Sequence, residues 1–520
     1  MSESQIPEQI VQFINSFYKA YLDNNVYELH GCYESQFNKL TDNFYSKSKW
    51  PNPINEIGPL VNNDPIFIVL YSEVYYRHIY AKLTPSLEDR IGSFNNYCNL
   101  FNLLLNNEDG PVNFELPNKW LWDIIDEFIY QFNQFQYYKS KILSNNKPSN
   151  EEELQYIQEN DGIWSAFSVF NALYSLVGRS KINEQLKYQR DNNTQSSPIE
   201  ISGDYGSLNL YKNLGYFSII GLLRTHTISG DFTLALKTME FIDLDKRAFF
   251  TRVPGCHFTT YYYVGYSFLM LHRYSDAIKI FSHILLYISR TKNINKSNRY
   301  DLISKKSDQM YALLTILIGI IPQRLDEILH SSIKEKFGHQ LNKIQRGEIE
   351  EIYSTIENLF KFGSPKFISN GLITNQENDS INLHLKIFML KLKQMIFIPT
   401  LKSYLSLYSN LELTKLAKFL NIDEIELNSI LLTYKLNNKQ LKWINGELLS
   451  GEYVSVYDLD IELTTSKDSK TLILVKETKN LRKFADWFIR NSIKNYAVKD
   501  VINGEKQSIQ LKSKQQSIKK

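Results

Sequence analysis

The sequence predicts an all-α chain in which a solenoid of helical, tetratricopeptide-like (TPR-like) repeats is followed by a winged helix with a small β-hairpin and by a C-terminal helix. Three observations support this fold class. Hydrophobic residues recur at helical spacing over most of the chain up to residue 434. Two helical hairpins with matching small and aromatic residues follow one another in its middle. Two runs with near-alternating hydrophobic residues lie after position 452, as in a pair of strands.

Residues 1–190 are expected to form an N-terminal helical domain, because apolar stripes at helical spacing run through it. The stripes are Ile10, Phe13, Ile14, Phe17, Tyr21 and Leu22, then Trp120, Ile124, Phe128, Ile129, Phe132 and Phe135, then Trp164, Phe167, Phe170, Leu173, Tyr174 and Val177. Residues 191–206 are polar and rich in helix breakers. We expect them to form a surface loop between two helical blocks.

Residues 207–400 are expected to form the TPR-like repeats. Such a repeat needs a small residue on its first helix, an aromatic at the turn, an alanine where the helices cross and an aromatic further along the second helix. The residues that fit this packing pattern are Gly265, Tyr274, Ala277 and Phe281 in one unit and Phe232 and Ala235 in the unit before it. The two alanines are 42 residues apart, more than the usual spacing of about 34. The repeats are therefore degenerate, and generic helical hairpins remain the alternative.

Residues 401–480 are predicted to form the winged helix. Its second helix begins after Asp423, which with Glu426 has the spacing of a capping box. We expect this helix to bury Ile425, Ile430, Leu431 and Tyr434. The strands are expected at 453–463 and 471–478, and none before about residue 438.

A last amphipathic helix is expected over residues 481–503, followed by a disordered, Lys-rich tail over 504–520. The apolar stripe of this assembly helix includes Leu481, Phe484, Phe488, Ile489 and Ile493. Because the winged helix closes its own small core, part of this stripe is expected to have no intramolecular partner. Exposed apolar surfaces of this kind mark association sites.

The composition is that of an ordinary globular protein. The 520 residues are 43% hydrophobic and 22% charged, and the net charge is +3, so the whole chain has no polyelectrolyte character. The 34 tyrosines and 30 phenylalanines fill helix cores or, alternatively, stack on RNA bases. Cys32, Cys98 and Cys256 are far apart and odd in number, which indicates no disulfide framework and a reducing compartment. Neither a signal peptide nor a membrane span is expected.

A search for catalytic and metal-binding motifs finds none. The sequence has no phosphate loop ending in GK[ST], no HExxH and no GxSxG. Cys256 and His257 are adjacent but lack a third partner, so we interpret them as packing in a loop after Pro254. No cluster of ligand residues has the spacing of a metal site. We therefore expect neither catalytic, cofactor-binding nor metal residues, no small-molecule substrate and no enzyme. An enzyme without a familiar motif remains an alternative.

The winged helix raises the possibility of nucleic-acid binding. Its second helix begins with carboxylates, which would repel phosphates. Lys435, Lys439 and Lys442 lie at its far end and just beyond. These lysines are candidates for contact with an RNA backbone, and a solvated face is the alternative. A protein that binds RNA on its own is accordingly a second hypothesis.

Helical repeats that lead into a winged helix and a terminal helix resemble the PCI family of scaffold subunits. Residues 401–431, LKSYLSLYSNLELTKLAKFLNIDEIELNSIL, carry this resemblance, which the proteasome lid, the COP9 signalosome and initiation factor 3 share. Longer strings are similar to one branch, the subunit L family of eukaryotic initiation factor 3. They are VPGCHFTTYYYVGYSFLMLHRYSDAIKIFSHILLYISRTK at 253–292, LPNKWLWDIIDEFIYQF at 116–132 and LYKNLGYFSIIGLLR at 210–224.

The resemblance implies a non-catalytic scaffold in a cytoplasmic complex that binds the small ribosomal subunit and promotes the loading of mRNA and initiator tRNA. It implies other initiation factor 3 subunits as partners, with the K and E subunits as neighbours, and a PCI helical part from about residue 280. It offers no catalytic residues. A PCI subunit of the proteasome lid or of the COP9 signalosome remains an alternative.

Overall fold

The computed structural model divides into two compact units. The first unit contains Met1–Lys391 and Leu441–Glu452, and the second contains Leu392–Gln440 and Tyr453–Lys520. The residues that the structure describes are 6–107, 110–144, 151–191, 198–244, 248–291, 300–321, 323, 325–346, 348–368, 379–395, 398–444, 446–455, 459–465, 471–477, 488–489 and 491–504. The predicted stripe residues Leu481 and Phe484 and the predicted tail from 505 onward lie outside them.

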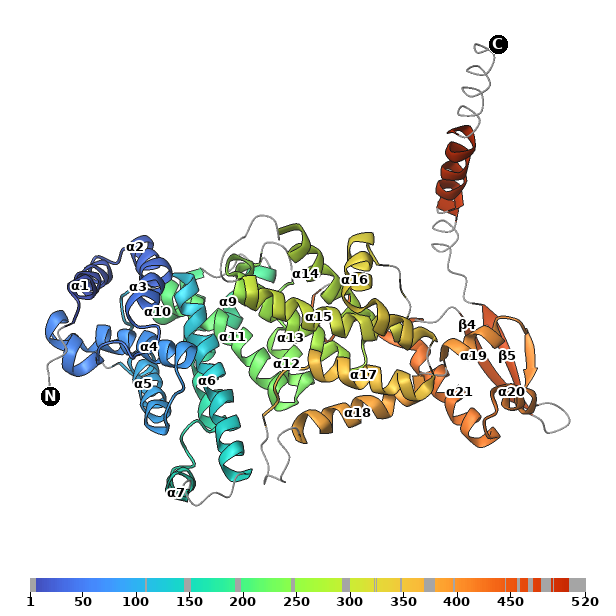
Figure 1. Cartoon of the computed structure of the whole chain (residues 1–520), viewed down its shortest axis with the longest axis horizontal. Coiled ribbons are helices and arrows are strands. Elements are labelled where there is room, and N and C mark those ends of the chain that lie inside the picture. Colours follow the sequence, from blue (N-terminus) through green and yellow to red (C-terminus); the bar gives the residue numbers. More distant parts are fainter. Residues whose placement is uncertain are drawn as a thin grey trace, which may run out of the picture. The chain divides into compact units, whose positions relative to one another are not determined.

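The N-terminal part of the first unit is an assembly of helices (Figure 1), and aromatic side chains stack on one another inside it. Phe17 on the first helix stacks on Trp120 of α6 with ring centroids 5.6 Å apart, and Trp120 in turn stacks on Tyr33 at 5.0 Å. The elements are α1 (Glu8–Leu22), α2 (Val26–Gly31), the π-helix η1 (Cys32–Gln36), α3 (Phe37–Phe44), η2 (Pro53–Ile57), η3 (Gly58–Val61), α4 (Pro65–Lys82), α5 (Leu87–Leu105), α6 (Asn118–Ser144), α7 (Glu151–Glu159), α8 (Ala166–Ser180), α9 (Ile182–Asp191) and α10 (Pro198–Gly206).

Two expectations for this part are wrong in detail. Leu22, Phe167 and Tyr174 of the predicted stripes are exposed. Helix α8 begins only at Ala166, and its buried face runs through Val169 and Leu173 instead. Residues 198–206 form α10 rather than a loop. Pro198 suits the first turn of a helix, and the segment packs on α8, α9 and α11.

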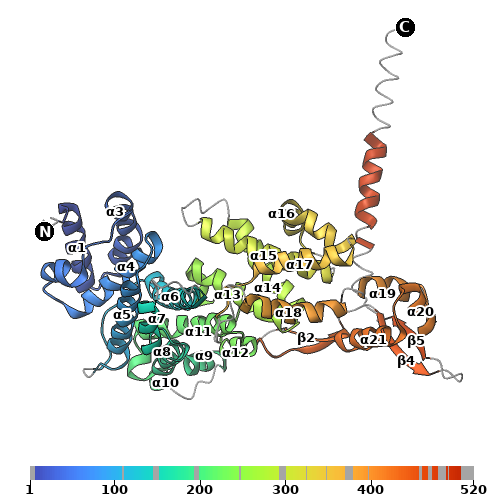
Figure 2. The ribbon, with the colours of Figure 1, turned by 60° about the horizontal axis from the view of Figure 1, so that its bottom comes forward.

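The TPR-like repeats continue the first unit as successive helical hairpins (Figures 1 and 2). Helix α11 pairs with α12 and α13 pairs with α14. Nearly every residue of α11 and of α13 is buried, as expected of helices that are covered on all sides. The elements are α11 (Asn209–Ser229), α12 (Phe232–Thr238), η5 (Phe249–Arg252), α13 (Pro254–Met270), α14 (Tyr274–Thr291), α15 (Tyr300–Ile320), α16 (Glu327–Arg346), α17 (Ile349–Gly363) and α18 (Asp379–Met395).

Most of the predicted packing residues of these hairpins are buried. Ala235 and Ala277 are both fully buried. A Cβ atom on Gly265 would lie 2.6 Å from the ring of Phe281, so only glycine fits where α13 meets α14. Tyr274 is buried, whereas Phe232 is half-buried and contacts other aromatic rings.

The second unit holds the winged helix. Strand β5 lies between β1 and β4 in an antiparallel sheet, with Leu411 opposite Ile473 and Ile461 opposite Val475. Tyr434 ties the helices to this sheet, because its hydroxyl donates to the Leu459 carbonyl at 2.8 Å. The elements in this region of the chain are α19 (Ile398–Leu405), β1 (Asn410–Glu412), α20 (Leu413–Leu420), α21 (Glu424–Asn438), β2 (Lys439–Lys442), β3 (Glu452–Ser455), β4 (Leu459–Thr465) and β5 (Thr471–Glu477).

Three expectations for the winged helix are wrong. β1 is a strand well before residue 438, and its three residues are too few to show an alternating pattern. Asp423 occupies the N-cap position of α21 without forming a side-chain cap. Ile425 is 81% exposed, because it lies on the side of α21 opposite Leu427 and Leu431, which face the core.

Candidate functional site

A segment that we call the strap, residues 441–452, belongs to the first unit although the chain reaches it through the winged helix. Arg273, at the turn between α13 and α14, holds the strap by its carbonyl groups. Its Nη1 donates to the Leu448 and Leu449 carbonyls at 2.8 and 3.3 Å, and its Nη2 donates to the Ser450 carbonyl at 3.2 Å. The fork of the guanidinium thereby satisfies three backbone acceptors at once.

Asp276, in the first turn of α14, binds the strap together with Arg273, and we call these two residues the clamp. The carboxylate is almost fully buried and accepts hydrogen bonds from the Trp443 backbone N–H at 3.0 and 3.1 Å. It also accepts from Arg273 Nε at 2.9 Å. Burial raises the pKa of Asp276, and the hydrogen bonds from Arg273 and Trp443 oppose that rise. The Nζ of Lys279 lies 4.4 Å from the centroid of the Trp443 ring, which adds a cation–π contact.

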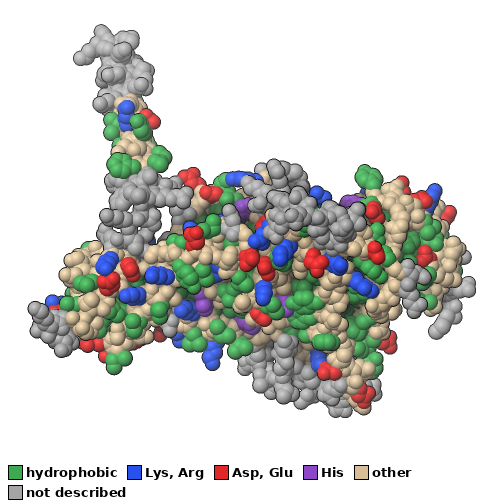
Figure 3. All heavy atoms as spheres, turned by 180° about the vertical axis from the view of Figure 1, so that it is seen from behind, with side chains coloured by type: hydrophobic (Ala, Val, Ile, Leu, Met, Phe, Trp, Pro, Cys, Tyr) green, Lys and Arg blue, Asp and Glu red, His purple; other side chains and the backbone are tan. Residues whose placement is uncertain are grey.

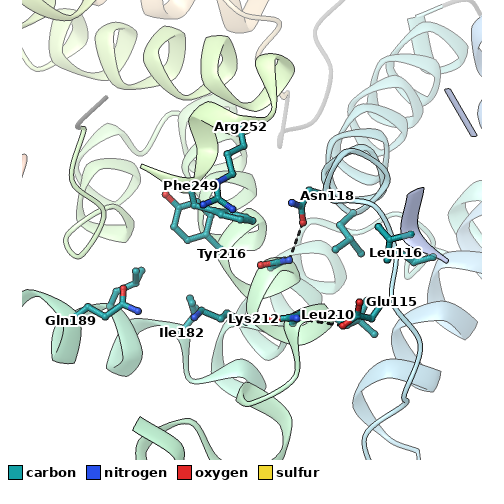
Figure 4. A pocket seen from close by; sticks show the side chains of 15 residues that line it. Glu115, Leu116, Asn118, Ile182, Gln189, Leu210, Lys212, Tyr216, Phe249 and Arg252 are labelled. Atoms are coloured by element: carbon teal, nitrogen blue, oxygen red, sulfur yellow. Dashed lines mark hydrogen bonds between the residues drawn. The ribbon is translucent and has the colours of Figure 1, made fainter. Parts of the chain in front are cut away.

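A cavity of about 560 Å³ opens between α6, α9, α11 and η5 (Figure 4). Asn213 Nδ2 donates to Asn118 Oδ1 at 2.9 Å, and Asn209 Nδ2 donates to Glu115 Oε1 at 3.3 Å. The described residues that line the cavity include no Ser, Thr, Cys, His or Asp. For polar contacts the lining offers amides, the Glu115 carboxylate, the Tyr216 hydroxyl and the cations of Lys212 and Arg252. A Ser or Cys nucleophile beside a His base is not among these described lining residues.

Helix α6 carries a carboxyl group in the helical core, Glu127, whose Oε2 is buried and accepts no hydrogen bond among the described residues. Burial raises the pKa of Glu127 to about 7, although Arg77 and Arg224 act in the opposite direction. Above pH 7 the Glu127 carboxylate is therefore ionised in the folded chain, where it is less well solvated than in the unfolded chain. This difference lowers the free energy of unfolding.

We expect Glu127→Gln to raise the free energy of unfolding by about 1–3 kcal/mol at pH 8. Below about pH 4.5 the carboxyl group is neutral in both the folded and the unfolded chain, so the gain should disappear there. Urea denaturation at pH 4 and at pH 8 measures the difference, with Glu350→Gln on an exposed turn of α17 as the control. An equal effect at both pH values would contradict the expectation.

Cys256 and His257 lie within α13 and not in a loop, because Pro254 is the first residue of this helix. Both side chains are buried. Burial raises the pKa of the Cys256 thiol and lowers the pKa of His257 to about 4. His257 contacts the rings of Tyr261 and Tyr287. A protonated thiol and a neutral imidazole in an aromatic core are packing groups, and this arrangement lacks the thiolate of a nucleophilic site.

The three candidate RNA-binding lysines are all exposed but do not belong to one compact unit. Lys435, on α21, and Lys439 lie in the second unit, whereas Lys442 belongs to the strap in the first unit. Within the described part of the chain, groups of three or more His, Cys, Asp or Glu residues that could hold a metal ion do not occur. In the same part, no helix is long and apolar enough to span a membrane.

The C-terminal helix presents an apolar surface. Residues 488–489 and 491–504 are helical, and hydrophobic side chains cover much of the described part of this helix in the space-filling view (Figure 3). Phe488, Ile489 and Ile493 of the predicted stripe are exposed, as is Tyr496.

Sequence reasoning missed the clamp of Arg273 and Asp276. The string HRYSDA, in which an arginine and an aspartate three residues apart open the second helix of a repeat, is a local signal for an ion pair. It does not indicate a partner that lies about 170 residues further along the chain.

Known proteins are similar to this chain over nearly its whole length. A family model described as RNA polymerase I-associated factor PAF67 matches residues 89–495. Eukaryotic translation initiation factor 3 subunit L of Yarrowia lipolytica is 48% identical over 518 residues, which cover 99% of this chain and 93% of that protein. The chain belongs to the family of eukaryotic translation initiation factor 3 subunit L. The proteins of the same name from Nematostella vectensis and Homo sapiens are 44% and 41% identical, over 94% and 93% of this chain and 91% and 88% of theirs.

Membership in the subunit L family confirms the resemblance that the sequence shows. The chain is a translation initiation factor subunit by family, with TPR-like helical repeats, a winged helix and a C-terminal helix in a PCI architecture. Other subunits of initiation factor 3 are the partners that this family implies.

Proposed function

We propose that this chain is a non-catalytic, cytoplasmic scaffold subunit of initiation factor 3. In this role it supports binding of the complex to the small ribosomal subunit and recruitment of mRNA and initiator tRNA. Its direct partners in the proposal are other subunits, the K and E subunits foremost, and the small ribosomal subunit.

The exposed apolar stripe of the C-terminal helix carries the proposal. Ile489 and Ile493 are 56% and 63% exposed, and their separation of four positions corresponds to about one helical turn. Both side chains would be buried if this helix joined helices of other subunits in a bundle, where such stripes interdigitate. In this role the chain holds helices of partner subunits in place and catalyses no reaction.

The lining of the cavity in Figure 4 is consistent with a role that needs no catalysis. So are the electrostatics of Cys256 and His257, which favour the thiol and the neutral imidazole. Lys435 and Lys439 remain available for a weak contact with RNA, because both are exposed.

We expect Ile489→Asp with Ile493→Asp to leave the isolated chain folded, because both side chains are solvent-exposed. In the complex, each carboxylate would be buried against apolar surface at a cost of several kcal/mol. Co-purification with the other subunits of initiation factor 3 should therefore fall at least tenfold.

Asn491→Asp with Asn495→Asp is the matched control, since it adds the same two charges away from Ile489 and Ile493 on a helical projection. This variant should co-purify like the wild type. Wild-type recovery of the Ile489 and Ile493 variant would place the assembly surface elsewhere on the chain.

A further inference from the structure

Helix α21 of the winged helix carries an apolar stripe on its outer face. Ile425, Leu432 and Leu436 are 81%, 47% and 77% exposed. At 3.6 residues per turn their positions fall within about 40° of one another around the helix axis. Their spacing is that of a heptad, with Ile425 and Leu432 at d positions and Leu436 at an a position. The a position between Ile425 and Leu432 is occupied by the small, exposed Ser429.

The stripe is separate from the core of the winged helix. Leu427, Leu431 and Tyr434 are fully buried on the opposite side of α21, and the hydrogen bond from Tyr434 to the Leu459 carbonyl fixes that side against the sheet. Rotating α21 to hide its outer stripe would expose these three residues. The stripe therefore stays available to a partner.

Charges at the two ends of α21 restrict what that partner is. Glu424 and Glu426 are exposed at its N-terminal end, and Lys435 and Lys439 are exposed at its C-terminal end. Among the described residues none of these four forms an ion pair. A helix that lies antiparallel, with acidic residues near its own N-terminus and basic residues near its C-terminus, would bring opposite charges together at both ends.

A nucleic acid fits this face less well. Recognition of bases or phosphates needs hydrogen-bond donors and cations along the helix, whereas the centre of this face is aliphatic and its N-terminal end is anionic. Heptad spacing of aliphatic residues is instead the pattern of a seam between two helices.

We propose that the outer face of α21 is the docking seam for an amphipathic helix of another subunit of the complex, antiparallel to α21 and carrying aliphatic residues at heptad spacing. This inference rests on the proposed scaffold role and deepens it, because it assigns the winged helix a partner of its own beside the C-terminal helix.

A photo-crosslinker tests which partner lies on the stripe. Benzoylphenylalanine is introduced in place of Leu436 in the full chain, the complex is purified and irradiated, and crosslinked peptides are identified by mass spectrometry. A crosslink to a helix of another subunit that has aliphatic residues at heptad spacing supports the proposal. A crosslink to RNA, a crosslink between two copies of this chain, or no crosslink overturns it.

The variant Leu432→Gln with Leu436→Gln measures how much the seam contributes. Both residues are exposed, so the isolated chain should keep its fold. We expect the variant to dissociate at least ten times faster than the wild type from the purified complex of the other subunits. Leu390→Gln with Leu407→Gln changes two exposed leucines outside α21 and serves as the control, with a wild-type rate.

The failure of this inference is distinguishable from the failure of the proposed function. If the α21 variant dissociates at the wild-type rate while the Ile489 and Ile493 variant is lost from the complex, the seam is wrong and the scaffold role stands. If the wild-type chain does not associate with the other subunits at all, both are wrong.

Discussion

Ala277→Trp is expected to lower the free energy of unfolding of the helical repeats by about 3 kcal/mol. Ala277 is fully buried on α14, close to the place where Gly265 of α13 meets the ring of Phe281. An indole at this crossing forces α13 and α14 apart, because densely packed interiors have no room for the added atoms. Ala235→Trp, at the equivalent position of α12, should act in the same way. Urea denaturation followed by far-UV circular dichroism measures both variants.

Arg290→Trp is the control for the effect of the indole itself, since Arg290 is exposed in the last turn of α14. Its denaturation midpoint should stay close to that of the wild type. If Ala277→Trp matched this control, the helix crossing would not be the close contact that the repeat pattern predicts.

Arg273→Ala is expected to release the strap from the first unit. The substitution removes the donors to the Leu448, Leu449 and Ser450 carbonyls and leaves Asp276 buried without its cationic partner. Breaking a buried ion pair by removing one member costs about 3–5 kcal/mol. The backbone N–H of Trp443, which donates to Asp276 in the folded chain, should then exchange with deuterium at least a hundredfold faster.

Hydrogen–deuterium exchange of the full chain, read out on peptides that cover residues 441–452, is the measurement for the clamp. Arg273→Lys keeps the charge but not the planar fork, so it should give intermediate protection. Arg290→Ala, on an exposed turn of α14, should leave protection unchanged. Unchanged exchange in Arg273→Ala would mean that other contacts hold the strap.

The sequence predicted the elements whose signal is local and periodic. The stripe of α1 from Ile10 to Phe17 and the small residues Ala235 and Ala277 lie where helical spacing placed them, because burial of one helix face repeats every three to four residues. Ile425 was wrongly grouped with Ile430, Leu431 and Tyr434 because apolar residues lie on both sides of α21, and only the position of the sheet decides which side is buried.

Contacts between distant parts of the chain were beyond the reach of a single sequence. Strand β1 exists because Leu411 pairs with Ile473, and the clamp exists because Arg273 meets Leu448. Neither partner can be identified from the residues around the other, since a strand of three residues and an Arg–Asp spacing of three each fit many structures. The candidate assembly surface was predicted more easily, because the apolar character of Phe488, Ile489 and Ile493 is evident from the sequence itself, and all three side chains are exposed.

The position of the strap also affects the order in which the chain can fold during its own synthesis. The helices that hold the clamp leave the ribosome first, but the segment that fills it follows only after residues 392–440 of the second unit. The second unit is likewise interrupted until residue 453 has emerged. Neither unit can therefore be completed while the other is still unmade, and a fragment that ends at residue 391 would leave Arg273 and Asp276 facing water with their backbone partners missing. The order of these segments along the chain therefore makes the completion of one unit depend on the synthesis of the other.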